Sequence, residues 1–174
     1  MNSNNKPVSP INMHPTPNNT PTQFNTPTTQ IKDSGERREF SSGAVRDITT
    51  GKGRFDLMPL NIIANISTLQ SDYKAILNCL HNFTLTNSVK YLYDALTIFN
   101  PTYNHLLLLA IHYENGALKY GEYNWQKGIP VSSYVDSAAR HLTKHYANQT
   151  DEPHDIAFLW NIVSCIWTAE NCPD

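Results

Sequence analysis

The sequence predicts an all-α domain that follows a disordered tail, and two observations support this fold class. After residue 59, apolar residues recur at intervals of three and four, as on one face of a helix. No run alternates with period two over enough residues to make a convincing strand. The 174 residues fit one domain, and a hydrophobic content of 40% that is concentrated outside the tail can build a core.

The first 33 residues form the tail, which consists of Asn, Thr, Pro and Ser with only isolated apolar residues. This composition buries too little surface to offset the entropy cost of ordering, so we expect disorder. The tail lacks the apolar stretch of a signal peptide and the arginines of a transit peptide. Elsewhere the apolar run 106–111 is too short to cross a bilayer, which predicts a cytoplasmic protein with no membrane partner.

Cysteine content and net charge disfavour several classes of protein. Cys79, Cys165 and Cys172 are widely spaced and form no CxxC pair, so we expect reduced thiols, not a disulfide framework or a zinc knuckle. A net charge of −2 and the lack of a long basic run disfavour a nucleic-acid partner.

A basic, glycine-containing segment, 34–58, follows the tail. Its frequent glycines disfavour regular helix and permit close approach of the backbone to a ligand. Its arginines, among them Arg37, Arg38 and Arg46, are donors suited to phosphate. Two interpretations remain open, an ordered loop that contacts phosphate and a solvated, flexible linker.

The first helices are expected after Pro59. Apolar residues between 60 and 69, and again between 73 and 80, predict two short helices. A third helix is expected over about 89–99 and ends before Pro101, because proline disfavours helical geometry in the residue that precedes it.

A longer helix is expected over about 103–120. It ends at Gly121, and Lys119 in its last turn faces the negative end of the helix dipole. A loop over 122–130 follows.

Two further helices complete the prediction. One is expected over about 133–146, since Ser133 with Asp136 three residues later resembles a capping box. The last is expected over about 151–170, with Pro153 in its first turn.

The three longer helices carry polar residues beside apolar ones, and this combination indicates a site. These residues are Glu114 on the first helix, Asp136, Arg140 and His141 on the second, and His154 and Asn161 on the third. Taken singly, each has a structural explanation. Their joint occurrence in a segment that is otherwise sparing of charge favours catalysis.

Several of these structural explanations are specific. Asp136 can cap its own helix or form an i,i+4 ion pair with Arg140. Asn161, between two apolar faces, needs either a buried hydrogen-bond partner or a ligand. His154 is expected in a first helical turn, where the dipole favours the neutral imidazole that can bind metal, although a lone surface histidine is the commoner case.

Glu114 and Trp125 carry similar alternatives. Glu114 is flanked by apolar residues, so we expect a semi-buried acid that needs Arg140, Lys119 or a divalent metal as its partner. Trp125, beside Asn124 in the loop, either stacks on a base or fills the core.

Four segments, in order along the chain, resemble one protein family. They are 34–47 (SGERREFSSGAVRD), 112–130 (HYENGALKYGEYNWQKGIP), 136–141 (DSAARH) and 151–161 (DEPHDIAFLWN). They resemble the dATP/dGTP diphosphohydrolases of bacteriophages and prophages, including the MazZ type linked to 2-aminoadenine genomes. The resemblance covers residues 34–174 except about 61–104, which we interpret as a lineage-specific helical insertion.

The resemblance implies an all-α, MazG-like hydrolase in phage nucleotide metabolism, located in the host cytoplasm if the chain is phage-encoded. Such an enzyme converts a purine deoxynucleoside triphosphate, dATP or dGTP, to the monophosphate and pyrophosphate. Its chemistry uses Mg²⁺ or Mn²⁺ to neutralise phosphate charge and orient water. MazG-like domains generally oligomerise to bury helix faces, which implies a homo-oligomer.

Within the matching segments, the residue types suggest three groups of site residues. The catalytic group is Glu114, Asp136 and His141. The metal-binding group is Glu114, Asp136, Asp151 and His154. The substrate-binding group is Arg37, Arg38, Arg46, Lys119, Asn124, Trp125, Arg140 and Asn161.

One departure from the wider MazG-like pattern leaves alternatives open. That pattern usually has Glu-x-x-Glu followed by Glu-x-x-Asp, but here Ala117 stands three residues after Glu114. The last helix also has His154 and Asn161 where further acids are expected. A noncatalytic nucleotide-binding or sequestering phage protein is therefore the alternative, and a virion-associated adaptor that docks a partner through its tail is a third hypothesis.

Overall fold

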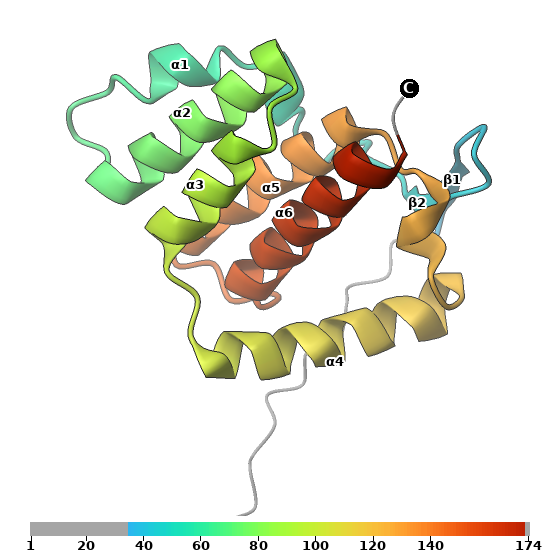
Figure 1. Cartoon of the computed structure of the whole chain (residues 1–174). Helices are drawn as coiled ribbons and strands as arrows, with labels where there is room; N and C mark the ends of the chain where they lie inside the picture. Colours follow the sequence, from blue (N-terminus) through green and yellow to red (C-terminus); the bar gives the residue numbers. More distant parts are fainter. Residues whose placement is uncertain (1–34, 173–174) are drawn as a thin grey trace, which may run out of the picture.

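The computed structural model describes residues 35–172, so the predicted tail lies outside the described residues. Within this range the chain is mostly helical, which confirms the all-α class. Helices α5 (Val131–Tyr146) and α6 (His154–Asn171) pack side by side at the centre (Figure 1). Their contact forms the middle of the core.

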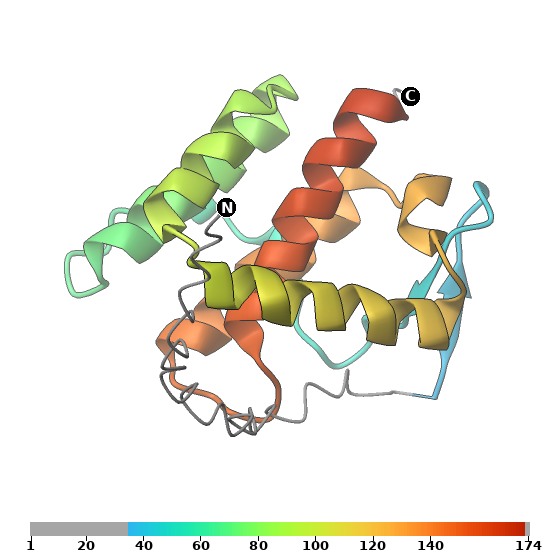
Figure 2. The same cartoon turned by 60° about the horizontal axis from the view of Figure 1, so that its bottom comes forward.

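The other long helices cover two sides of this central pair. Helices α2 (Ser71–Thr86) and α3 (Lys90–Phe99) lie together on one side, where α2 packs against α5 and α3 against α6. Helix α4 (Tyr103–Tyr120) crosses α6 on another side (Figure 2). Rings of Phe99 and Phe158, 4.9 Å apart, join α3 to α6.

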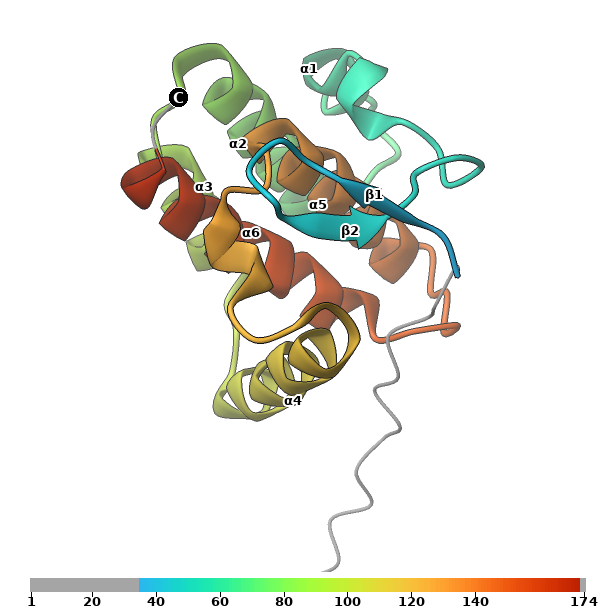
Figure 3. The same ribbon diagram turned by 90° about the vertical axis from the view of Figure 1, so that its right-hand side faces the viewer.

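A small β-hairpin corrects the prediction that 34–58 is a loop without strands. Strands β1 (Arg37–Glu39) and β2 (Val45–Asp47) pair antiparallel. Three residues are too few for period-two alternation to be recognised in the sequence. The turn depends on Gly43, which has a φ of 78° and donates from its backbone N to the Phe40 carbonyl over 2.8 Å. Figure 3 shows the hairpin lying over α5.

Helix ends that follow local rules lie where the sequence predicts them. Helix α3 ends before Pro101, and α4 ends at Gly121. The region after Pro59 was predicted less well: α1 is a single turn, Leu60–Ile63, and α2 extends beyond the apolar patch at 73–80 on both sides.

The predicted capping box at Ser133 and Asp136 is wrong. Helix α5 begins at Val131 directly after Pro130, and no side chain within residues 35–172 caps it. Asp136 therefore lies inside the helix, where its Oδ1 accepts a hydrogen bond of 2.7 Å from the Phe55 backbone N. Phe55 begins η1 (Phe55–Leu57), the 3-10 turn after the hairpin.

The start of α6 also differs slightly from the prediction. Pro153 is the N-cap residue and His154 the first helical residue, so the proline precedes the first turn. Cys79, Cys165 and Cys172 are free thiols, as predicted. Within residues 35–172, no helix combines the length and the apolar content needed to cross a membrane.

Candidate functional site

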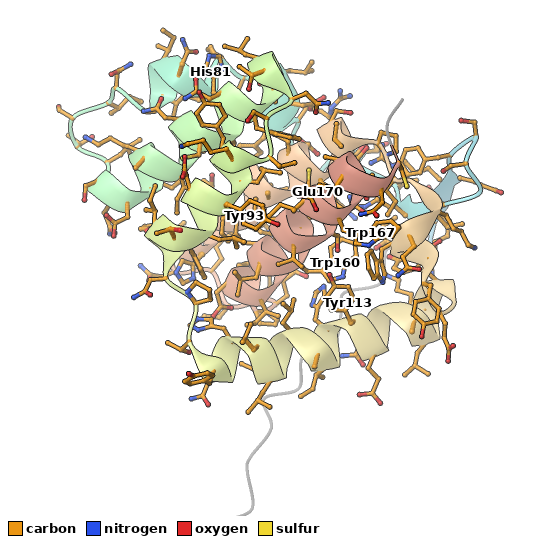
Figure 4. The ribbon with its side chains drawn as sticks, in the orientation of Figure 1. His81, Tyr93, Tyr113, Trp160, Trp167 and Glu170 are labelled. Atoms are coloured by element: carbon orange, nitrogen blue, oxygen red, sulfur yellow. The ribbon has the colours of Figure 1, made fainter. Side chains whose placement is uncertain are left out.

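A cavity of about 1010 Å³ lies between α4, the hairpin, η2 (Asn124–Lys127), and parts of α5 and α6. Small-molecule sites typically occupy about 300–1,000 Å³, so a nucleotide fits this space. Figure 4 shows Tyr113 of α4 and Trp160 of α6 in the space between these two helices. Both side chains line the cavity.

Asn124 attaches the hairpin to the helical body. Its side-chain Nδ2 donates to the Val45 carbonyl over 2.9 Å, and its Oδ1 accepts from the Val45 backbone N over 3.0 Å. The amide thus pairs with β2 as a neighbouring strand would. Asn124 lines the cavity, but its amide is occupied in positioning the hairpin.

Asp47 forms a second attachment between the hairpin and α4. It accepts hydrogen bonds from Lys119 Nζ over 2.9 Å and from the Tyr120 hydroxyl over 2.8 Å. Burial alone would raise the pKa of Asp47, but these two hydrogen bonds lower it below its ordinary value. Lys119 and Arg37, both predicted to contact substrate, instead face Asp47.

Arg46 projects from β2 into the wall of the cavity. Its Nη2 donates to Asn161 Oδ1 over 3.0 Å and to Ser137 Oγ over 3.2 Å. Its guanidinium also lies over the rings of Tyr134 and Trp160, 5.2 and 5.4 Å from their centroids. The two hydrogen-bond acceptors are neutral, and in the described part of the chain its Nη1 has no hydrogen-bond partner.

Burial lowers the pKa of Arg46 to about 10, which leaves the side chain protonated near neutral pH. The cavity wall therefore contains a buried positive charge whose hydrogen-bonding partners are uncharged. An anion in the cavity would neutralise this charge.

Asp136 and Arg140 form the buried i,i+4 ion pair that the spacing allows. Arg140 Nη2 lies 2.9 Å from Asp136 Oδ2, and their side chains are 7% and 5% exposed. Because Asp136 Oδ1 accepts from Phe55, both carboxylate oxygens already have partners within the protein. Arg140 lines the cavity and Asp136 does not, so this geometry gives no support to Asp136 as a metal ligand.

A cluster of metal-binding residue types lies where α5 approaches the start of α6. The Nδ1 atoms of His141 and His154 are 3.1 Å apart. Glu152 Oε1 lies 3.4 Å from the first of these atoms and 3.5 Å from the second. The other ring nitrogen of His154, Nε2, lies 2.8 Å from Asp151 Oδ1.

The pKa directions of His141 and Asp151 suit metal binding. Burial, followed by the charge of Arg140, lowers the pKa of His141 well below its ordinary value, so this imidazole is neutral at pH 7. The hydrogen bond from His154 lowers the pKa of Asp151, which stays a carboxylate. Neutral imidazole and carboxylate are the forms that bind divalent metal.

Aromatic side chains line another part of the cavity. Trp125 packs edge-on against Trp167, with ring centroids 4.9 Å apart, and against Tyr113 at 5.6 Å. It is partly buried against the core, as one sequence-based alternative expected, and it also lines the cavity; stacking on a base stays a prediction. The neighbouring His112 is buried, which lowers its pKa to about 4.

The cavity brings together most of the residues that the sequence singled out. Those that line it are Arg38, Arg46, Glu114, Asn124, Trp125, Arg140, His141, Asp151 and Asn161. Those outside its lining are Arg37, Lys119, Asp136 and His154.

Glu114 contradicts one expectation. It is exposed where α4 borders the cavity, so the prediction of a semi-buried acid is wrong. Its predicted partner Lys119 lies against Asp47, and its other predicted partner Arg140 lies against Asp136. An exposed carboxylate at this position is accessible to substrate and water.

Sequence reasoning missed several side chains that line the cavity, among them Lys52, His112, Tyr113, Lys144, Glu152 and Trp160. Glu152 and Trp160 lie within the segment 151–161 that carries the family resemblance. The spacing of Glu152, two residues before His154, could have been recognised in the sequence as a pair of metal-binding residue types. The spacing did not show which of the adjacent acids, Asp151 or Glu152, would approach His141.

A family model described as dATP/dGTP diphosphohydrolase, N-terminal, matches residues 84–174, more than half of the chain. The chain belongs to this family. The match confirms the family that the four segments indicated. The part matched to the dATP/dGTP diphosphohydrolase family contains α3 to α6, and hence His141, Glu152 and His154, but not the hairpin that carries Arg46.

No curated protein and no solved structure matches the chain. The MazG-like arrangement of the helices therefore stays a prediction. The family match begins inside the predicted insertion at 61–104, whose boundaries also stay a prediction.

Proposed function

We propose that this member of the dATP/dGTP diphosphohydrolase family is a metal-dependent hydrolase of purine deoxynucleoside triphosphates in phage nucleotide metabolism. It would convert dATP or dGTP to the monophosphate and pyrophosphate. The family assignment supports a nucleotide substrate. The observation that carries the proposal is the buried Arg46 guanidinium, which faces the cavity with uncharged hydrogen-bonding partners.

A triphosphate would supply an anionic partner for Arg46, whose hydrogen-bond partners among residues 35–172 are uncharged. Further cations line the same cavity: Arg38, Lys52, Arg140 and Lys144. Burial is the largest influence on the pKa of Arg38 and of Lys52 and lowers both, so each would gain from a phosphate that replaces lost solvation. These residues would hold the phosphates and neutralise charge as the pyrophosphate leaves.

The aromatic part of the cavity suits the base. Trp125, Tyr113 and Trp160 present ring faces and edges next to His112. Purines offer the larger ring system for stacking on such side chains. Trp160 also lies under the Arg46 guanidinium, so the proposed contacts for base and phosphates adjoin at this ring.

Hydrolysis requires water to attack the α-phosphorus while the bond to the α,β-bridging oxygen breaks. A bound divalent ion, Mg²⁺ or Mn²⁺ in the implied chemistry, would neutralise phosphate charge and lower the pKa of water. A carboxylate must accept the proton of the attacking water. Among the acids that line the cavity, Glu114 is exposed and would be such a group.

Product analysis with purified full-length protein tests the proposal. The protein is incubated with each of the four deoxynucleoside triphosphates and Mg²⁺ or Mn²⁺, and products are separated by ion-exchange chromatography. We expect monophosphate and pyrophosphate in equal amounts from dATP, dGTP or both. Absence of turnover with every purine nucleotide, or release of inorganic phosphate alone, would refute the proposal.

A noncatalytic nucleotide-binding protein is the second hypothesis, favoured by one observation. Asp136 is held by Arg140 and Phe55, and Ala117 occupies the position where an acid is usual after Glu114. Such a protein would keep the cationic cavity without turnover. Thermal stabilisation by dATP or dGTP that occurs without product formation would establish it.

The outer face of α4 supports the expectation of a homo-oligomer. Tyr103, Leu106 and Leu107, about two to three helical turns before Glu114, are 88%, 53% and 65% exposed at the start of this helix. Burial of such a stripe in a symmetric contact would remove apolar surface from water. Light scattering after size-exclusion chromatography should give a mass above 19.7 kDa, and Leu107→Glu should reduce it to that of one chain.

A further inference from the structure

Two histidines and one glutamate form a compact triangle of ligand atoms between α5 and α6. His141 Nδ1 and His154 Nδ1 are separated by 3.1 Å, and Glu152 Oε1 completes the triangle at 3.4 and 3.5 Å. The side chain of Glu152 is 14% exposed and that of His154 is 1% exposed. The three ligand atoms are therefore largely removed from solvent yet lie beside the cavity.

We propose that these three atoms bind one first-row transition-metal ion, such as Mn²⁺, Fe²⁺, Co²⁺ or Zn²⁺, in a two-histidine, one-carboxylate site. The inference deepens the proposed function and rests on it for the role of the ion in hydrolysis. The binding itself rests on the geometry of the three side chains.

The distances match a shared metal ion. A metal–ligand bond of about 2.1 Å places neighbouring ligands about 3.0 Å apart in octahedral geometry and about 3.4 Å apart in tetrahedral geometry. The measured edges of 3.1, 3.4 and 3.5 Å cover the same interval. Three ligands on one face leave the remaining positions open, and His141 and Glu152 place that open side at the cavity.

Asp151 fixes the ring of His154 in the orientation that binding requires. A carboxylate only accepts hydrogen bonds, so His154 Nε2 donates to Asp151 Oδ1 over 2.8 Å. In the neutral ring, Nδ1 then carries the lone pair that a metal needs. Carboxylates commonly orient metal-binding histidines in this way.

The donor atoms select the class of metal. Mg²⁺ prefers oxygen ligands and retains its water, whereas imidazole nitrogen suits Mn²⁺ and the later first-row ions. Two of the three ligands are nitrogen, so Mg²⁺ should compete weakly. The proposed site therefore replaces Glu114 and Asp136 as metal ligands and moves Asp151 to an outer role.

Without metal, the same triangle could be a hydrogen-bonded group in which one imidazole proton is shared. Cobalt titration separates these two cases. Metal-free full-length protein is titrated with Co²⁺, and ligand-field absorption in the visible range is followed together with calorimetric heat. We expect one Co²⁺ per chain and no displacement by Mg²⁺ in large excess.

Matched variants locate the bound ion. Glu152→Gln and His141→Ala should abolish the absorption band, whereas Glu122→Gln, which alters an acid elsewhere in the cavity lining, should leave it unchanged. Asp151→Asn should weaken binding by roughly 10- to 100-fold, because it removes only the partner of His154. Circular dichroism measures whether each variant is folded. If a variant of a buried ligand does not fold, Asp151→Asn provides the test, because Asp151 is exposed.

Several results would overturn the inference. They are absence of a ligand-field band in the wild-type protein, unchanged Co²⁺ binding in Glu152→Gln, and displacement of Co²⁺ by equimolar Mg²⁺. Hydrolysis supported by Mg²⁺ without Co²⁺ binding would refute this site and leave the proposed function standing. Co²⁺ binding without hydrolysis would refute the proposed function and leave this metal site standing.

Discussion

Replacement of Arg46 by methionine tests whether the buried guanidinium exists for binding or for folding. Methionine keeps an unbranched stem that can pack between Tyr134 and Trp160 but removes the charge. Ser137 Oγ keeps its second donor, Arg140 Nη2, whereas Asn161 Oδ1 loses Arg46 but lines the cavity, where water can replace it.

The structure allows the effect on stability to be worked out. Burial lowers the pKa of Arg46 to about 10, so the fold disfavours the charged form, relative to the unfolded chain, by roughly 3 kcal/mol. The two hydrogen bonds and the two cation–π contacts of Arg46 already act in this folded state and hold the charged side chain in place. Arg46→Met removes these contacts together with a buried charge that the fold disfavours, so the free energy of unfolding should change by less than about 1 kcal/mol.

The effect on ligand binding should be much larger. A hydrogen bond from a charged donor to phosphate contributes about 1.5–3 kcal/mol, so nucleotide affinity should fall roughly 10- to 100-fold. Calorimetry with an α,β-methylene analogue of dATP measures affinity without hydrolysis, and urea denaturation measures stability. The control is Arg54→Met, since Arg54 is half exposed, paired with Asp56 and outside the cavity lining.

Two outcomes would refute this reasoning. Unchanged affinity in Arg46→Met would show that the guanidinium does not contact the phosphates. A loss of more than about 3 kcal/mol of stability would show that the residue is held as a structural cation, as in a buried ion pair that loses one partner.

Three further predictions concern single side chains. Asp136→Asn should lower the free energy of unfolding by about 3 kcal/mol, because Arg140 would stay buried without its counter-charge; an unchanged urea midpoint would contradict this. Asn124→Ala should cost about 1–2 kcal/mol and speed hydrogen exchange at the Val45 amide, and unchanged exchange would show that the hairpin is held in another way. The pKa of His112 is about 4 when folded and 6.5 when unfolded, so the unfolded chain binds the proton first on acidification. Stability that is complete above pH 6.5 should therefore decline towards pH 4, by at most about 1.4 kcal/mol per pH unit. His112→Gln should flatten the melting temperature between pH 7 and 5, and parallel profiles for the two proteins would contradict the assignment.

Elements whose ends follow from local chemistry were predictable from sequence. Pro101 excludes helical geometry in the residue before it, and Gly121 ends α4 without the strain of a side chain. The Ser133–Asp136 pattern looked equally local, but Pro130 starts α5 earlier. The backbone N of Phe55, 81 residues away, instead donates a hydrogen bond to the carboxylate of Asp136. The contact with Phe55, which is distant in sequence, therefore determined the position of the Asp136 carboxylate, and the local capping-box pattern did not.

The hairpin was missed for a related reason. Its strands are too short to show a period, and its position depends on the amide of Asn124, 79 residues from Val45. Such pairing is fixed by tertiary structure and not by the strand sequence. The arginines of this segment were therefore predicted as phosphate contacts by residue type, but only the structure separates Arg46, in the cavity, from Arg37, against Asp47.

The candidate metal site and the candidate phosphate site lie in different elements of the chain, which makes their tests independent. Arg46 comes from β2, whereas Glu152 precedes α6. If each does what we propose, Arg46→Met weakens nucleotide binding and leaves Co²⁺ absorption intact, and Glu152→Gln abolishes Co²⁺ absorption while Arg46 still binds the metal-free nucleotide analogue. Loss of both ligands in both variants would instead mean that the cavity itself collapses. A parallel loss of stability in urea would then identify the two side chains as parts of the fold.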